Sequence, residues 1–403
     1  PKLRYAGAAR VCGISGSSGA FELCVATSVA AQVVAARHVV LAAGALERPL
    51  PIAGGALAGV AYAGAALRQL KTSRRTPPGR VVLAGCGPLL YAAAVALRRA
   101  GADVVAMLDT LNVMHFVRAL PDAIGFMRSS YYAAGAKLLQ EVNDNIPIYH
   151  DVIELAGLGN EKLASVRFTS NRRTVTLIAD TLLLHQGVVP DIYLADSLGC
   201  EIGWDDRLVG WAARVDVWGA SSVAGVFIAG DGAAIEGAMA AEHRGRICAL
   251  AAASALGHID SAARDSEAQA HRRALAEAMR GRRFLERVYR APQRFRLPQG
   301  QAIVCRCEGV TAEEVIAAAR HAKPGPNQVK AFLRCGMGPC QGRECSLTVT
   351  EMIAHEHRSD PAQVGRFRAR FPARAMSLTE LASLADAADG DAACDAPIMP
   401  GEG

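Results

Sequence analysis

Residues 80–110, RVVLAGCGPLLYAAAVALRRAGADVVAMLDT, limit the possible folds more than any other segment. Residues 80–84 have the composition of a buried parallel strand, and Gly85-Cys86-Gly87 predicts a tight turn. A helix is expected over residues 88–100, with proline in its first turn, and a second strand over 103–108. A strand, a helix and a strand in this order form a βαβ unit. The sequence therefore predicts an α/β protein with a doubly wound, Rossmann-like sheet.

The turn of this unit carries part of a dinucleotide-binding fingerprint. Gly85 and Gly87 allow the backbone to approach a pyrophosphate at the amino end of a helix, where free N–H groups favour anions. Leu90 stands where the third glycine belongs. Asp109 follows Gly85 by 24 residues, close to the ~20 expected for an acid that binds a ribose. Two interpretations remain: a nucleotide site, or the turn of a Rossmann-like domain that has lost its nucleotide.

Two other strands end in glycine, in VVLAAGALERP and in VFIAGDGAAIEGAMAAEHRG. Each signal is weak alone, but the two flank the βαβ unit, as in flavoenzymes that combine two dinucleotide folds. Asp231 in the second segment is placed to bind the ribityl chain or pyrophosphate of a flavin, to cap the next helix, or to do both. We expect that helix to begin near residues 233–235 and to point at the flavin.

Five of the eleven cysteines lie between Cys305 and Cys345, as a C-x-C pair followed by RCGMGPCQGREC. The chain shows no secretory signal, which predicts a reducing, cytoplasmic location and favours a metal over disulfides. Thiolates bind iron–sulfur clusters four at a time, and glycine-rich turns supply N–H donors. Zinc is the alternative, although a C-x-C pair strains a tetrahedral knuckle. Thr311 and Glu314 form a capping box for a helix over residues 312–322.

The remaining sequence limits partners and location. The net charge is +6 over 403 residues, and the basic segment within residues 258–300 has the spacing of a solvated amphipathic helix, so we expect no nucleic-acid binding. No run is long and apolar enough to predict a transmembrane helix. From residue 386 the low-complexity acidic sequence predicts a disordered tail.

The order of these motifs resembles the α (A) subunits of flavin-dependent amino-acid and opine dehydrogenases, which include those of opine oxidases and of dye-linked proline or hydroxyproline dehydrogenases. The cysteine segment is also similar to the [2Fe-2S] domain of bacterioferritin-associated ferredoxin. The resemblance covers about residues 30–385. These families begin with a strand–GxGxxG–helix that binds the FAD pyrophosphate, and this sequence has none. We therefore expect the chain to be truncated at its amino end, or its FAD binding to be weakened.

The resemblance implies five segments: residues 1–50 and 200–257 as the remainder of an FAD domain, 51–199 as a second Rossmann-like domain of NAD(P) or adenine-nucleotide type, 258–300 as a helical linker, 301–357 as the [2Fe-2S] domain, and 358–403 as an extension. It also implies sites. The cluster ligands would be Cys305, Cys307, Cys335 and Cys340, with Cys345 a surplus buried thiol. FAD would contact Ala43, Gly44, Gly230 and Asp231. A second nucleotide, NAD(P) or ATP, would contact Gly85, Gly87, Pro88, Leu89 and Asp109.

The implied function is that of an electron-transfer subunit. A flavin-containing β subunit would oxidise an amine or imino acid at a CH–NH or CH–NH2 group. Electrons would then pass through the [2Fe-2S] centre and FAD of this chain to an acceptor, which could be a peripheral membrane component. Cofactors carry such chemistry, so no catalytic side chain is predicted. Two alternatives are a stand-alone NAD(P)H:acceptor reductase and a non-catalytic scaffold or sensor with a zinc-filled cysteine site.

Overall fold

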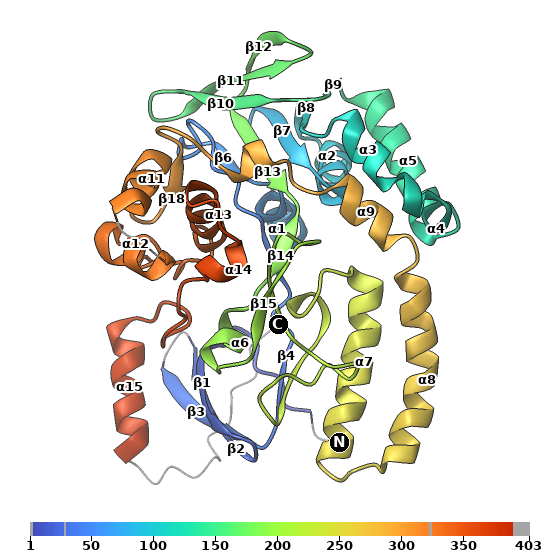
Figure 1. Cartoon of the computed structure of the whole chain (residues 1–403), viewed down its shortest axis with the longest axis vertical. Coiled ribbons are helices and arrows are strands. Elements are labelled where there is room, and N and C mark those ends of the chain that lie inside the picture. Colours follow the sequence, from blue (N-terminus) through green and yellow to red (C-terminus); the bar gives the residue numbers. More distant parts are fainter. Residues whose placement is uncertain (1–2, 28–29, 322–324, 390–403) are drawn as a thin grey trace.

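A computed structural model of the chain describes residues 3–27, 30–321 and 325–389. At the top of Figure 1 lies the second Rossmann-like domain, and at the bottom lies the flavin-type domain. The cysteine domain, formed by α11 to α14, packs beside both. The predicted combination of a Rossmann-like α/β core and a small helical domain is therefore confirmed, although helices cover only one face of the main sheet, so that it is not doubly wound as expected.

The upper domain is built on a five-stranded sheet of order β6-β13-β7-β8-β9. Apolar strands are buried on both faces, because α1, α2 and α5 cover one face and the three-stranded sheet β10-β11-β12 covers the other. The elements are β6 (Val60–Tyr62), α1 (Ala63–Ser73), β7 (Arg80–Cys86), α2 (Pro88–Arg99), β8 (Asp103–Asp109), α3 (Val113–Ala119), η1 (Leu120–Asp122), α4 (Ala123–Met127), α5 (Ser130–Asn145), β9 (Ile148–Tyr149), β10 (Glu154–Gly159), β11 (Leu163–Ser170), β12 (Arg173–Ile178) and β13 (Thr181–Gln186).

The βαβ unit is present as expected, whereas a later segment only partly has the arrangement that its sequence indicates. Residues 151–190 alternate in sequence like antiparallel strands. Strands β10 to β12 are antiparallel, whereas β13 pairs in parallel with β7 and β6 at the centre of the sheet. All six of its residues are buried, and a strand covered on both faces has no alternation by which its direction could be recognised.

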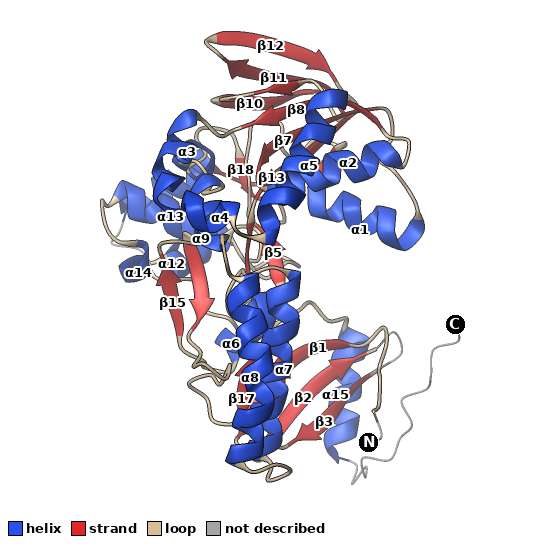
Figure 2. Cartoon of the chain, turned by 90° about the vertical axis from the view of Figure 1, so that its right-hand side faces the viewer, coloured by secondary structure: helices blue, strands red, loops and turns tan. Residues whose placement is uncertain are grey.

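The lower domain contains a short parallel pair, β4 with β17, beside the antiparallel sheet β1-β2-β3. The long helices α7 and α8 run side by side along it (Figures 1 and 2). The elements are β1 (Arg10–Ser17), β2 (Ala20–Ala26), β3 (Ala31–Ala36), β4 (Val39–Leu41), β5 (Ala45–Glu47), β14 (Val188–Pro190), α6 (Tyr193–Ser197), β15 (Ile202–Asp205), β16 (Gly210–Ala213), β17 (Val226–Ile228), η2 (Gly230–Gly232), α7 (Ala238–Ala255) and α8 (Ser261–Ala278).

The linker leads from the lower domain back to the upper one through α9 (Arg282–Val288) and α10 (Gln293–Arg296). It is not merely a solvated helix. Val288 is buried against Cys86 and Leu111 of the upper domain, and Phe284 and Tyr289 pack on the same cluster. The linker thus packs against the upper domain next to the turn that contains Cys86.

The cysteine domain comprises β18 (Ile303–Cys305), β19 (Val310–Thr311), α11 (Ala312–His321), α12 (Pro326–Leu333), α13 (Ser346–Glu356) and α14 (Pro361–Val364). The capping box that starts α11 is formed, since Thr311 N donates to Glu314 Oε2 at 2.8 Å and Glu314 N donates to Thr311 Oγ1 at 3.3 Å. Phe367 is buried in the core of this domain, so its packing extends beyond residue 357.

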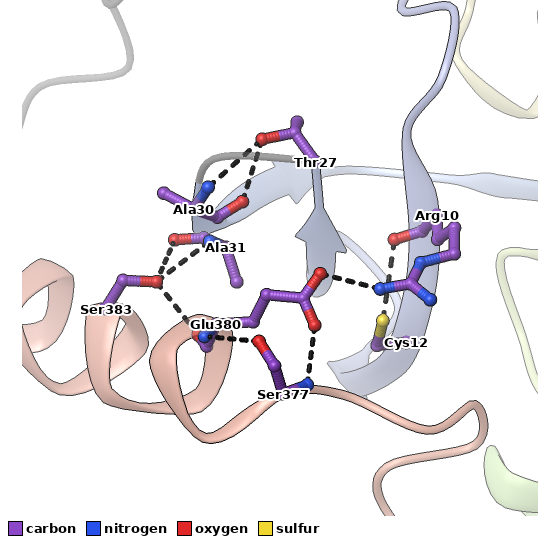
Figure 3. A network of polar contacts seen from close by, with 8 residues as sticks. All are labelled: Arg10, Cys12, Thr27, Ala30, Ala31, Ser377, Glu380 and Ser383. Carbon is purple, nitrogen blue, oxygen red and sulfur yellow. Dashed lines mark hydrogen bonds and ion pairs between the residues drawn. The ribbon is translucent and has the colours of Figure 1, made fainter. Parts of the chain in front are cut away.

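The carboxyl-terminal segment forms a helix, α15 (Leu378–Asp389), which lies on the sheet β1-β2-β3. Figure 3 shows the contact: Arg10 Nη2 donates to Glu380 Oε1 at 2.6 Å, and Ser383 Oγ accepts from Ala31 N at 2.8 Å. Residues 386–389, expected in a disordered tail, belong to this helix. The rest of the predicted tail, from residue 390, lies outside the described residues.

Candidate functional site

Five cysteines of the small domain converge from three elements. Cys305 ends β18, Cys307 follows in the next turn, and Cys335 follows the end of α12. Cys340 lies in the glycine-rich loop, and Cys345 is the residue at the amino end of α13. Because this loop brings α12 and α13 together, cysteines that are forty residues apart in sequence become neighbours.

The five thiols form an inner and an outer group. Sγ atoms of Cys305, Cys335 and Cys345 all lie within 4.8 Å of one another, and all three residues are buried. Cys307 is exposed and Cys340 is partly buried, and their side chains are hydrogen-bonded to each other. Cys345 is buried as expected, but its thiol lies inside the group and not apart from it.

Hydrogen bonds among the inner thiols favour a thiolate. Cys335 and Cys345 both donate to Cys305, which lowers the pKa of Cys305 to about 2. Hydrogen bonds to Cys305 and Cys335 raise the pKa of Cys345, and the bond to Cys305 raises the pKa of Cys335. All the cysteines in the described part of the chain are free thiols. A buried thiolate surrounded by further thiols is a donor set for a thiophilic metal centre.

The surroundings also fit an iron–sulfur cluster. Gly336 and Gly342 have φ values of 84° and 82°, which favour glycine and turn the backbone of the loop. Arg343, between Cys340 and Cys345, has buried Nε and Nη2 atoms without a hydrogen-bond partner in the described chain. Orphaned buried donors beside thiols are matched by an anionic group, and a cluster held by four thiolates is one.

The flavin-type turns are adjacent, as expected from their parallel strands. Gly44 follows β4, and Gly230, Asp231 and Gly232 follow β17. A methyl group on Gly232 would lie only 3.7 Å from the Gly44 backbone nitrogen. Asp231 acts as a cap: its Oδ1 accepts from Glu236 N at 3.0 Å and from Gly237 N at 3.2 Å. The helix that follows begins at Ala238, later than expected, because this capped turn precedes it.

A cavity of about 390 Å³ lies between these turns and the second nucleotide turn. Its wall includes Asp231 and Gly237 from the lower domain and the residues Gly87, Pro88 and Leu89 from the upper one. Linker residues also line it, among them Tyr289. Ala45, next to the expected contact Gly44, also lines it. Of the predicted contacts, Asp231 from the first set and Gly87, Pro88 and Leu89 from the second thus line one cavity. The lining does not include Ala43, Gly44, Gly230, Gly85 or Asp109.

The second nucleotide turn has the expected backbone. Gly85 and Gly87 have φ values of 135° and 120°, which other residues rarely adopt. Any Cβ on Gly85 would collide with the carbonyl of His185 on β13. Pro88 occupies the first turn of α2. The turn is therefore suited to approach an anion at the amino end of a twelve-residue helix.

Asp109 is engaged within the protein. Its Oδ2 accepts from the hydroxyl of Tyr91 at 2.8 Å, and its Oδ1 accepts from Leu111 N at 2.9 Å. The residue is 4% exposed. Burial and the negative charge of Asp109 raise the pKa of Tyr91. Tyr289 of the linker packs edge-on against Tyr91, with ring centroids 6.4 Å apart. The carboxylate expected to bind a ribose is thus occupied by Tyr91.

Two buried polar side chains near the cavity, His185 and Arg48, make contacts that were not identified from the sequence. His185 Nδ1 and Glu47 Oε1 are 2.7 Å apart, and His185 is almost fully buried. Arg48 is also buried; it donates to the carbonyl oxygens of Val209 and Leu208. In the sequence, Glu47 and Arg48 lie in LERP and His185 lies in LLLHQG, and both segments are ordinary ends of strands. No local motif distinguishes such residues, because their partners are more than a hundred residues away.

Comparison with known proteins agrees with both parts of this arrangement. Residues 7–254 match the family of pyridine nucleotide-disulphide oxidoreductases, and residues 303–355 match the BFD-like [2Fe-2S] binding domain. The A subunit of opine oxidase from Rhizobium meliloti is 41% identical over 88% of this chain and 68% of its own length. The chain belongs to the family of opine oxidase A subunits. The predicted resemblance is confirmed, and with it a flavin-dependent oxidoreductase family whose cofactors are FAD and a [2Fe-2S] cluster.

Further members and neighbours of the family extend this comparison. The A subunit of opine oxidase from Agrobacterium tumefaciens (strain Ach5) is 40% identical over 89% of this chain and 72% of its own. Hydrogen cyanide synthase subunit HcnB from Pseudomonas aeruginosa is 30% identical over 83% of this chain and 73% of its own. In fold, the chain is similar to L-proline dehydrogenase from P. horikoshii, with a TM-score of 0.62 and 16% identity, over 93% of this chain and 64% of that one.

Proposed function

We propose that this chain is the electron-transfer subunit of a heteromeric dehydrogenase that oxidises an opine or a related secondary amine or amino acid. The main support is one arrangement: a set of cysteine thiols suited to a [2Fe-2S] cluster lies in the same chain as the flavin-type turns. Bound flavin would supply two-electron chemistry and the cluster one-electron transfer. The side chains of this subunit would hold the cofactors, exclude water and fix their separation.

A partner subunit would contain the site of amine oxidation. The relatives are named as the A subunit of opine oxidase and as a subunit of hydrogen cyanide synthase, and these names support a multi-subunit enzyme. The electron acceptor is proposed to be a separate redox protein or a peripheral membrane component. Among the described helices, none combines the length and hydropathy needed to cross a bilayer.

For the cluster we propose Cys305, Cys307 and Cys340 as ligands. The fourth ligand is one of the two remaining inner thiols, Cys335 or Cys345. The sequence pattern suggested Cys335 as the fourth, but the helix ends favour Cys345. Cys345 lies at the amino end of α13, where the helix dipole stabilises a thiolate. Cys335 follows the carboxyl end of α12, where the dipole has the opposite sign.

The alternative of a stand-alone NAD(P)H reductase has weaker support. In that function Asp109 would bind the cofactor ribose, yet its carboxylate already accepts hydrogen bonds from Tyr91 and Leu111. The linker residue Tyr289 also lines the cavity to which the turn at Gly87 belongs. An adenine nucleotide without a redox role remains a candidate ligand for this turn.

The decisive experiment is anaerobic purification of the full chain together with its proposed partner subunit. We expect about two irons per chain, a [2Fe-2S] EPR signal after reduction, and reduction of the complex by an opine or an imino acid. Purified complex that holds zinc and no iron would support the scaffold alternative. Rapid flavin reduction by NADH would support the reductase alternative.

A further inference from the structure

Arg343 is a largely buried cation within the loop that carries the proposed cluster cysteines. It stands between Cys340 and Cys345, and its side chain is only 11% exposed. One terminal nitrogen, Nη1, donates to the carbonyl oxygens of Ala373 at 2.8 Å and of Cys340 at 3.3 Å. The guanidinium is therefore held in place by the same loop that holds the thiols.

Its other nitrogens have no such partner. Nε and Nη2 are buried and make no hydrogen bond within the described residues. A guanidinium is charged at every physiological pH and carries five N–H donors. Donors of this kind are rarely left unsatisfied in a protein interior. Arg343 lies between Cys340 and Cys345 in sequence and contacts the carbonyl oxygen of Cys340, so an anionic group held by these cysteines would match its free donors.

The charges around Arg343 leave an excess of one positive charge. Asp191 Oδ2 lies 3.8 Å from Arg343 Nε and 3.5 Å from Arg374 Nη2. The ring of Tyr193 lies 4.3 Å from the guanidinium carbon of Arg343, and burial raises the pKa of that tyrosine, which keeps it neutral. One carboxylate thus faces two arginines, of which only Arg343 is buried.

Asp191 also joins this loop to the flavin-type turn. Its backbone N–H donates to the carbonyl of Gly44 at 3.0 Å, and its side chain is 4% exposed. The contacts therefore run from Gly44 through Asp191 and Arg343 to Cys340. A rigid, buried connection of this kind fixes the position of the guanidinium relative to both cofactor sites.

We infer that Arg343 sets the reduction potential of the [2Fe-2S] centre. Reduction adds one negative charge to a centre that already carries the charge of four thiolates, so a fixed cation and its N–H donors favour the reduced form. The interaction is strong because the site is buried and little screened by water. This inference rests on the proposed function, since it requires the cluster to be present. Arg343 is a positioning and charge-setting residue, not a ligand.

The test is an EPR-monitored redox titration of the full chain with dithionite, in variants that retain iron. Arg343→Met should lower the equilibrium constant for one-electron reduction of the cluster about tenfold. This corresponds to a fall of about 59 mV in its reduction potential. Arg343→Lys should restore most of that shift because it keeps the charge. Arg374→Met is the matched control; this arginine contacts the same carboxylate but is 47% exposed, so its removal should change the potential much less.

Asp191→Asn provides a test that leaves Arg343 in place, and should raise the potential because it removes the opposing negative charge. The inference is overturned if Arg343→Met and Arg343→Lys both titrate like the unchanged chain with full iron content. It is also overturned if Asp191→Asn lowers the potential, or if Arg374→Met produces an equal shift. Absence of iron from the unchanged chain would instead contradict the proposed function itself.

Discussion

Arg48 and Glu351 lie 3.9 Å apart, each with a side chain 5% exposed, although they belong to different domains. Arg48 follows the flavin-type turn, and Glu351 lies on α13, the helix that begins next to Cys345. Arg296 of the linker pairs with the same carboxylate. One buried acid therefore joins the flavin-type domain, the linker and the cysteine domain.

Glu351→Gln should destabilise the chain by about 3–5 kcal/mol, because it leaves the buried Arg48 and the partly buried Arg296 without their counter-charge. Chemical denaturation of the full chain measures this. Glu356→Gln is the matched control on the same helix, since Glu356 pairs with Arg320 at the surface, and it should change stability little. Equal stabilities of the two variants would contradict a role for Glu351 in holding the domains together.

Cys345→Ser should lose the cluster, and Cys335→Ser should retain it. The physical reason is the opposite orientation of the helix dipoles at these two thiols. Iron content and the EPR signal of the reduced chain measure the outcome, and Cys248→Ser, a buried cysteine of α7, controls for general effects of the substitution. The reverse pattern would restore the ligand set suggested by the sequence.

Asp109→Asn should reduce stability by about 1–3 kcal/mol, since the carboxylate accepts buried hydrogen bonds from Tyr91 and Leu111. Tyr91→Phe should act in the same direction. Neither variant should alter the response to NADH, which we expect to leave the flavin oxidised in the unchanged chain. A large change in NADH affinity with unaltered stability would instead show that Asp109 binds a ribose.

The docking of α15 should depend on pH. Hydrogen bonds from the backbone of Ser377 and the charge of Arg10 hold the pKa of Glu380 below its ordinary 4.5. A depressed pKa contributes stability that is present above pH 4.5 and is lost as the pH falls through the lower, folded value. The protection of residues 378–389 from hydrogen exchange, taken relative to the intrinsic exchange rate at each pH, should therefore fall at acidic pH. Glu380→Gln should exchange faster at neutral pH and respond less to acidification.

The sequence was most informative where structure is local. The unit β7-α2-β8, the capping box of Thr311 and the convergence of the cysteines all follow from contiguous patterns. Contacts between distant segments were missed, such as the pairing of Glu351 with Arg48 and the position of β13 in the sheet. Such contacts depend on how domains pack, and neither partner differs locally from an ordinary surface or strand residue.

For a similar reason, the sequence restricts the cluster ligands to a set of candidate cysteines but does not identify all four. Spacing identifies five candidate cysteines, but the choice between Cys335 and Cys345 depends on which helix end each thiol faces. That orientation is set by the turn through Gly336 and Gly342. The prediction for Asp109 likewise rested on its distance from Gly85 in sequence, whereas its availability depends on Tyr91.

The helix α13 has a consequence for assembly of the holoprotein. It begins next to a proposed cluster ligand, Cys345, and carries Glu351 about 9 Å further along its axis, at ~1.5 Å per residue. A cluster bound at the first turn of this helix would also fix the position of the Glu351 carboxylate, which pairs with Arg48 and Arg296 outside the cysteine domain. Insertion of iron and sulfide and closure of the domains are then thermodynamically linked, so that each favours the other, and the immature chain should open more readily than the mature one.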